Sequence, residues 1–219
     1  MKTTKRVAVV LAGCGVQDGS EIHEAVLTLL YLDEAGAEVS FFAPDIDQAR
    51  VVNHLTGDEM PEIRNTLVES ARIARGKIRD LREAKAADFD ALIVPGGFGA
   101  AINLSDFAYK GAELSVQKDF LAFAQAVHKA GKPIGLICIA PAMAAKICGA
   151  GTEFTIGNDA ATAANIEASG GKHIACTVGN TVIDRNRKLV TTPAYMLAKG
   201  IGEAATGIRK LVGEVLELA

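Results

Sequence analysis

The chain has 219 residues, of which 49% are hydrophobic, and its formal net charge is −3. This length and composition are typical of one large domain with an ample core, and we expect a single domain over residues 1–219. The lysines and arginines are interleaved with acidic and apolar residues, as in 72–82, which argues against nucleic acid as a partner.

The start of the chain and its cysteines predict the cellular compartment of the protein. The first expected strand begins at Arg6, which leaves no room for a cleavable leader, and no apolar run approaches the length of a membrane span. Cys14, Cys138, Cys148 and Cys176 show neither a C-x-x-C pair nor metal-ligand spacing with the histidines, which favours reduced thiols and no bound metal. We therefore expect a cytoplasmic protein away from membranes.

Apolar strands alternate with helical patterns along the whole chain. In the first half of the chain we expect a strand at 6–12, a helix at 20–35, a strand at 38–43, an irregular or hairpin insert at 47–58, a helix at 64–75 and a strand at 91–95. A helix at 117–130, a strand at 134–137 and a helix after Cys138 should follow. The last part should contain strands at 152–155, 174–178, 181–184 and 189–192, the last two joined as a hairpin through 185–188, and a helix at 194–218. This order predicts an α/β fold, a doubly wound and mostly parallel sheet with helices on both faces.

In such a sheet, ligands bind at the carboxyl ends of the strands. Four loops lie at these ends: 12–20, 95–100, 138–141 and 191–195. Residues 96–99 lack the G-x-G-x-x-G spacing of a dinucleotide site and the Lys-Ser/Thr ending of a phosphate loop, so nucleotide binding is disfavoured.

Cys138 lies where a buried strand turns directly into a helix. Unpaired backbone N–H groups and the positive end of the helix dipole favour the thiolate there and would lower its pKa below the usual value of about 8.5. The backbone N–H of Ile139, together with that of Gly97, could hold an oxyanion formed when the thiolate attacks a carbonyl. The alternative is a small buried cysteine without chemistry.

Three other side chains are candidates on the first loop and helix. Glu21 and Glu24 follow the first loop, and either carboxyl could serve Cys138 as an acid or base, although acids are also common in the first turn of any helix. His23 is the only histidine near a candidate loop, and capping the helix or facing solvent is its alternative role. Cys14 could be a second thiol or redox partner, or simply a small residue in a turn.

Several blocks of the sequence resemble a known family. Residues 95–99, Pro-Gly-Gly-Phe-Gly, and the elbow at 135–141 resemble the ThiJ/PfpI superfamily of class I glutamine amidotransferase-like proteins, and the blocks at 12–25, 53–57, 94–101 and 190–197 resemble one bacterial branch of it. The resemblance implies a flavodoxin-like fold, frequent homodimers, no cofactor, and a glyoxalase (lyase) activity on small dicarbonyls that converts glyoxal to glycolate. A link to isoprenoid biosynthesis also accompanies that branch.

The resemblance also implies roles for residues. It places the nucleophile at Cys138, the oxyanion donors at the backbone of Gly97 and Ile139, and the glutamate of the first helix at Glu24, with Glu21 as the alternative. After Cys138 the chain has only His173 and no His-Pro-Glu motif, which argues against glutamine hydrolysis. A redox-responsive or regulatory protein with an oxidisable Cys138, and an amidotransferase subunit that acts only through a partner, remain alternatives.

Overall fold

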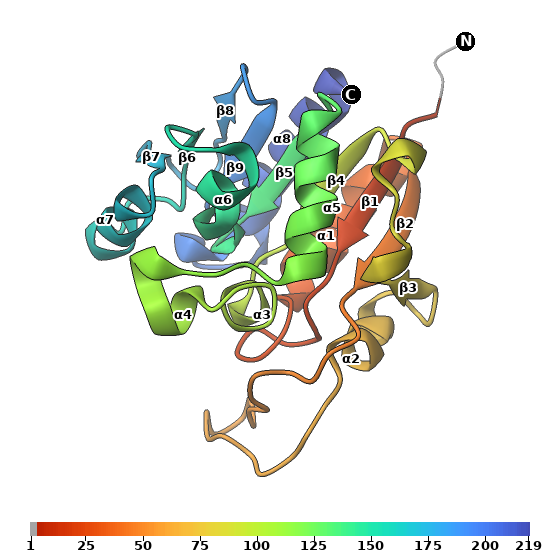
Figure 1. Ribbon diagram of the computed structural model, residues 1–219, viewed down its shortest axis with the longest axis vertical. Coiled ribbons are helices and arrows are strands. Elements are labelled where there is room, and N and C mark those ends of the chain that lie inside the picture. The colour runs from red at the N-terminus through yellow and green to blue at the C-terminus, as the bar shows by residue number, and fades with distance from the viewer. Residues whose placement is uncertain (1–3) are drawn as a thin grey trace.

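The computed structural model describes residues 4–219 as an α/β protein built on a central sheet (Figure 1). The seven-stranded sheet has the order β3-β2-β1-β4-β5-β9-β8, and every neighbouring pair is parallel except β8 and β9. Its strands are β1 (Arg6–Val10), β2 (Glu38–Ala43), β3 (Ile78–Asp80), β4 (Ala91–Val94), β5 (Ile134–Ile137), β8 (Val182–Asp184) and β9 (Leu189–Thr192). The predicted flavodoxin-like, doubly wound sheet is confirmed.

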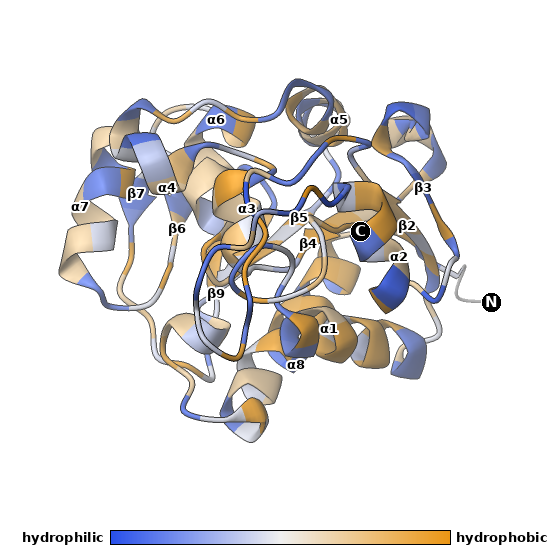
Figure 2. Ribbon diagram, turned by 90° about the horizontal axis from the view of Figure 1, so that it is seen from below, coloured by the Kyte–Doolittle hydropathy of each residue, from blue (hydrophilic) through white to orange (hydrophobic). Residues whose placement is uncertain are grey.

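Helices cover both faces of this sheet. Figure 2 shows α1 and α8 together on one side of the strands, and α5 and α6 on the other. The helices are α1 (Ile22–Glu34), α2 (Thr66–Ile73), α3 (Phe98–Ile102), α4 (Phe107–Lys110), α5 (Lys118–Lys129), α6 (Ala144–Cys148), α7 (Ala160–Ala168) and α8 (Ile201–Leu218), with 3₁₀ turns at 81–83, 86–88, 111–113, 140–143 and 194–196. No helix of the described part is both long and apolar enough to cross a bilayer.

The central strands explain why this arrangement forms. Every residue of β4, β5 and β9 is buried, as expected for parallel strands that are covered by helices on both faces. Two apolar cores result, one on each side of the sheet. Gly36 and Gly131 follow α1 and α5 with φ of +70° and +69°, the left-handed conformation that ends a helix at low cost in glycine.

Two predictions in the last third of the chain are wrong. Residues 174–178 are not a strand; instead β7 (Lys172–His173) pairs with β6 (Glu153–Phe154) in a separate two-stranded sheet, and α7 connects these two strands. Only Ile166 of α7 is buried, so this alanine-rich helix has no apolar stripe that a periodicity argument could detect. The helix predicted at 194–218 is interrupted, since Gly200 is extended and α8 begins only at Ile201.

The insert predicted at 47–58 is present and lies beyond the carboxyl edge of the sheet, at the bottom of Figure 1. It leaves the sheet after β2 and returns at α2. Isolated antiparallel bridges join Asp47 to Asn65 and Val52 to Glu59, so the segment is an irregular hairpin. The edge of the sheet that carries the candidate loops therefore also carries this insert.

Candidate active site

Cys138 occupies a strained turn directly after β5. Its φ is +61°, a left-handed conformation that is uncommon outside glycine, and its backbone N–H donates to the carbonyl oxygen of Thr192 at 2.9 Å. The chain then enters a 3₁₀ turn at Ala140 and reaches α6 at Ala144. Strain of this kind persists only where the surrounding structure holds it, and it is frequent at nucleophiles that are presented on a sharp turn.

Glu24 lies in the interior, 0% exposed, and faces Cys138. The backbone N–H of Gly96 donates to its Oε2 at 2.9 Å, and the backbone N–H of Tyr195 donates to its Oε1 at 3.2 Å. The carboxyl group also shares a hydrogen bond with the Cys138 side chain. Two strand-end loops, after β4 and after β9, thus hold this carboxyl group against the thiol.

The environment makes Glu24 a group that can exchange protons near neutral pH. Burial raises its pKa from the ordinary value of 4.5 to about 8, the negative charge of Glu21 adds to the rise, and the hydrogen bonds from Tyr195, Gly96 and Cys138 oppose it. A carboxyl group with this pKa is mostly protonated at pH 7 and is converted to the base by a small rise in pH.

The expected lowering of the Cys138 pKa is wrong. Burial raises the pKa of this thiol well above its ordinary value, the charge of Glu24 raises it further, and the backbone N–H groups of Gly97 and Ile139 lower it only in part. The helix behind the turn is short and is preceded by a 3₁₀ turn, which weakens the dipole argument. Cys138 therefore needs a base to take its proton, and Glu24 is the carboxyl group in contact with it.

The two predicted oxyanion donors lie side by side at the sulfur. The backbone N–H groups of Gly97 and Ile139 both form hydrogen bonds with Cys138. Gly97 has a φ of +90°, and a Cβ at this position would lie 2.5 Å from the carbonyl oxygen of Gly19. Gly96 was not singled out from the sequence, yet a Cβ there would lie 2.8 Å from Glu24 Oε2 and would also collide with Cys138. Both glycines are required for the close approach of the loop to the thiol.

Glu21 and His23 lie at the rim of the site. Glu21 is the N-cap of α1, where its Oε2 accepts the backbone N–H of Glu24 at 2.7 Å. His23 is half-exposed, with Nδ1 2.7 Å from the Tyr195 hydroxyl oxygen and 4.0 Å from Glu21 Oε1. The sequence did not single out Tyr195, although it ends one of the four candidate loops; its backbone rather than its side chain contacts Glu24.

Cys14 has different neighbours. It is partly buried on the first loop, and burial together with the charges of Glu69 and Asp18 raises its pKa, against the opposing charge of Arg72. Its charged neighbours therefore belong to α2 and to the first loop itself, whereas Cys138 faces Glu24. A redox pairing of the two thiols stays a prediction without a contact to support it.

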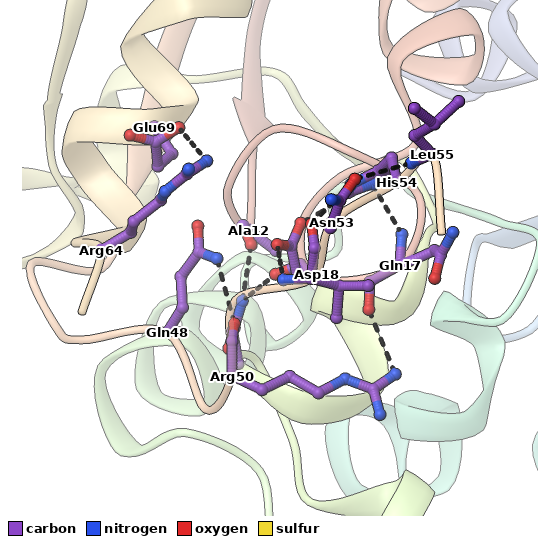
Figure 3. Close-up of polar contacts among 12 residues, drawn as sticks. Ala12, Gln17, Asp18, Gln48, Arg50, Asn53, His54, Leu55, Arg64 and Glu69 are labelled. Carbon is purple, nitrogen blue, oxygen red and sulfur yellow. Dashed lines mark hydrogen bonds and ion pairs between the residues drawn. The ribbon is translucent and has the colours of Figure 1, made fainter. Parts of the chain in front are cut away.

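Polar contacts fasten the insert to the first loop (Figure 3). The buried carboxylate of Asp18 accepts the backbone N–H of Val52 at 2.8 Å, and its Oδ1 lies 3.8 Å from His54 Nε2. Gln17 donates its backbone N–H to His54 Nε2 at 3.2 Å and accepts a hydrogen bond from Arg50 at 3.2 Å. These residues hold the first loop in place and were not recognised from the sequence, because their partners are far away along the chain.

A pocket of about 380 Å³ opens onto Cys138. Gly97 and Ile139 belong to its lining, and so do Glu21 and Tyr195. A substrate that enters this pocket can meet the thiol and both oxyanion donors. Among residues 4–219, no group of three His, Cys, Asp or Glu side chains is arranged to hold a metal ion.

Comparisons with curated proteins show close relatives in animals. The chain is 49% identical to a human protein named glutamine amidotransferase-like class 1 domain-containing protein 3, mitochondrial, over 97% of this chain and 83% of that one. It is 48% identical to the rat ES1 protein homolog, mitochondrial, over 97% of this chain and 84% of that one. A zebrafish ES1 protein, also mitochondrial, is 31% identical over 87% of this chain and 76% of its own length.

These relatives overturn the expectation of a cytoplasmic protein. All three carry a mitochondrial assignment in their names. That expectation relied on the absence of a leader pattern before Arg6. The absence of such a pattern from the given residues does not determine the compartment in which the protein acts.

A solved structure and a family model agree with the fold. The crystal structure of an isoprenoid biosynthesis protein with an amidotransferase-like domain from Ehrlichia chaffeensis matches with a TM-score of 0.92 and 35% identity, over 98% of this chain and 99% of that one. Drosophila melanogaster DJ-1beta shares the fold at a TM-score of 0.56 and 19% identity, over 99% and 96%. The DJ-1/PfpI family model matches residues 5–194. The chain therefore belongs to the DJ-1/PfpI family.

Proposed function

We propose that this protein is a glyoxalase that converts glyoxal and other small dicarbonyls to 2-hydroxy acids without a cofactor, giving glycolate from glyoxal. The observation that carries the proposal is the buried pair of Cys138 and Glu24, joined by a hydrogen bond beside two backbone N–H donors. Membership of the DJ-1/PfpI family supports it. The sequence blocks at 12–25, 53–57, 94–101 and 190–197 resemble the bacterial protein ElbB, for which this activity is expected.

In the first step, ionised Glu24 takes the proton of the Cys138 thiol while the sulfur attacks one aldehyde carbon of glyoxal. The backbone N–H groups of Gly97 and Ile139 stabilise the oxygen as it becomes negative. Glu24 then returns the proton to this oxygen, which leaves a neutral hemithioacetal on Cys138 and an ionised carboxylate.

In the second step, Glu24 removes the proton from the carbon bonded to sulfur, giving an enediolate. The hydroxyl proton of this carbon passes to the oxygen of the neighbouring carbon, and Glu24 delivers the proton that it holds to the neighbouring carbon itself. The first carbon is thereby oxidised and the second reduced, so no external oxidant or reductant is needed. The product is a thioester of glycolic acid on Cys138. Water hydrolyses the thioester, which releases glycolate and a proton and restores the thiol.

The structure offers less support for the alternatives. His173, the histidine that follows Cys138 in sequence, belongs to β7 in the small second sheet, so it does not supply the triad of a glutamine hydrolase. A redox sensor needs a thiolate at neutral pH, whereas the pKa of Cys138 is raised by burial and by Glu24. A thiol in contact with a carboxyl group that exchanges protons near neutral pH fits addition to a carbonyl better than oxidation.

The proposal is tested by following ¹³C-labelled glyoxal by NMR in a phosphate buffer, which avoids the amine adducts that imitate turnover. We expect catalytic formation of labelled glycolate, many equivalents per protein molecule. Consumption of glyoxal without glycolate, or no more than one equivalent per chain, would mean that Cys138 merely traps carbonyl compounds, and the glyoxalase assignment would then fail.

A further inference from the structure

The pocket at Cys138 is large for the substrate that the family resemblance suggests. Its volume of about 380 Å³ lies within the roughly 300–1,000 Å³ that is usual for pockets that bind complete metabolites or drug-sized ligands. Glyoxal has only four heavy atoms, and a water molecule in the liquid takes about 30 Å³. A molecule of that size would leave most of the pocket filled with water.

Apolar side chains make up much of the lining of the pocket. We call six of these residues the apolar subsite, two from α3, two from α4, one beside the nucleophile and one after β9: Phe98, Ala101, Phe107, Ala108, Ile139 and Met196. None of these side chains can donate or accept a strong hydrogen bond. The subsite is therefore suited to a hydrocarbon group and not to a second polar carbonyl.

Part of this surface is apolar and in contact with water. Phe98 is 47% exposed and Val16, which also lines the pocket, is 41% exposed. Large exposed apolar side chains that gather around a pocket are typical of a surface covered by a ligand. Covering them with a hydrocarbon group removes apolar area from water and so favours binding.

The insert also contacts the apolar subsite. The guanidinium carbon of Arg50 lies 5.3 Å from the centre of the Phe98 ring, within the range of a cation–π contact. The same guanidinium group donates to the backbone oxygen of Gln17, so it has two partners. The insert thus contacts the Phe98 ring, which also lines the pocket.

We infer that the apolar subsite binds the hydrocarbon substituent of an α-oxoaldehyde, so that the preferred substrates carry an aryl or branched alkyl group beside the dicarbonyl. The inference rests on the proposed function. The Cys138 sulfur bonds to the aldehyde carbon, the proton of that carbon passes through Glu24 to the ketone carbon, and water cleaves the resulting thioester. The product is a 2-hydroxy acid that keeps the substituent, as phenylglyoxal would give mandelate.

The test compares kcat/KM for glyoxal, methylglyoxal and phenylglyoxal at equal free-aldehyde concentration. Since one methylene in an apolar pocket changes kcat/KM by about 10-fold or more, we expect phenylglyoxal to exceed methylglyoxal by at least about tenfold. Equal or lower values for phenylglyoxal would overturn the inference while leaving the glyoxalase proposal in place.

An Ala108→Leu variant tests whether the apolar subsite causes the preference for phenylglyoxal. Ala108 is exposed on α4 and lines the subsite, so the added side chain fills the subsite without disturbing the core. We expect the ratio of phenylglyoxal to glyoxal kcat/KM to fall about tenfold or more. Ala122→Leu, at an exposed position of α5, is the matched control and should leave the ratio unchanged. An unchanged ratio in Ala108→Leu would show that the substituent does not bind in the apolar subsite.

A binding measurement separates failure of the inference from failure of the proposed function. Calorimetric titration with mandelate and with glycolate needs no turnover. We expect mandelate to bind at least about tenfold more tightly than glycolate, and Ala108→Leu to abolish the difference. If no dicarbonyl is turned over but mandelate still binds preferentially, the proposed function fails and the subsite stands; equal binding of the two acids overturns the subsite.

Discussion

Cys138 and Cys148 are both buried thiols, each 7% exposed, yet their surroundings give them different chemistry. Burial raises the pKa of both, to about 12 for Cys148. Cys148 ends α6 near the charges of Asp184 and Arg187 and has ordinary helical geometry, whereas Cys138 has a strained backbone, two backbone N–H donors and a carboxyl group that can take its proton. Cys138 therefore differs from Cys148 in its hydrogen-bond partners and its backbone conformation, and not in a lowered pKa.

The largest effect is expected from removing the nucleophile. Cys138→Ala should reduce glycolate formation to the background rate, because no other group in the pocket can form the hemithioacetal. Cys148→Ala is the matched control and should keep most of the activity, although its small cavity lowers stability by about 1 kcal/mol or more. Steady-state kinetics and urea unfolding check both changes. Equal losses in the two variants would remove the distinction between the thiols.

The next largest effect is expected from the proton carrier. Glu24→Gln keeps the shape but cannot exchange a proton, so kcat should fall by about 10²–10⁴-fold. Glu21→Gln should cost much less, because Glu21 caps α1 and influences Glu24 only through its charge. A greater loss in Glu21→Gln than in Glu24→Gln would show that Glu21 is the acid or base.

The pH dependence should follow the raised pKa of Glu24. Ionised Glu24 is the base for the first step, so kcat/KM should rise with pH and level off above about 8. In Glu21→Gln this limb should move to lower pH, since the charge of Glu21 helps to raise the pKa of Glu24. A wild-type profile that is flat between pH 6 and 9 would contradict the role of Glu24.

The same pKa predicts how stability changes with pH. Between pH 4.5 and about 8 the folded protein holds a proton on Glu24 that the unfolded chain releases. The contribution of this proton to the free energy of unfolding is therefore complete below pH 4.5 and is lost as the pH rises through about 8. Urea unfolding at pH 5 and pH 8 should show this loss in the wild type and a smaller one in Glu24→Gln. Equal pH dependence in the two proteins would speak against the raised pKa.

The smallest effect is expected at the rim. Tyr195→Phe removes the hydroxyl group that contacts His23 but keeps the backbone N–H that holds Glu24. We expect less than about tenfold change in kcat/KM and a stability change near 1 kcal/mol, the usual net value of one hydrogen bond. His23→Gln should behave in the same way. A loss of kcat/KM as large as that of Glu24→Gln would show that the Tyr195 hydroxyl group or His23 takes part in the reaction.

Local patterns were sufficient for much of the fold. The strands at 38–43 and 134–137 were predicted with their observed bounds, because buried parallel strands read as short apolar runs between turn residues. α7 and β7 were missed because an alanine-rich helix with one buried residue, and a two-residue strand, leave little signal in the sequence.

By itself, the sequence determined the sheet, the corner on which Cys138 lies and the set of loops that surround it, since apolar periodicity and glycines are local properties. Only the tertiary structure decided how these groups act. The raised pKa of Cys138, the contact of Glu24 with the thiol and the apolar subsite from α3 and α4 depend on burial and on partners far apart in the chain. Desolvation is a property of the packed interior, and no spacing in the sequence reports it.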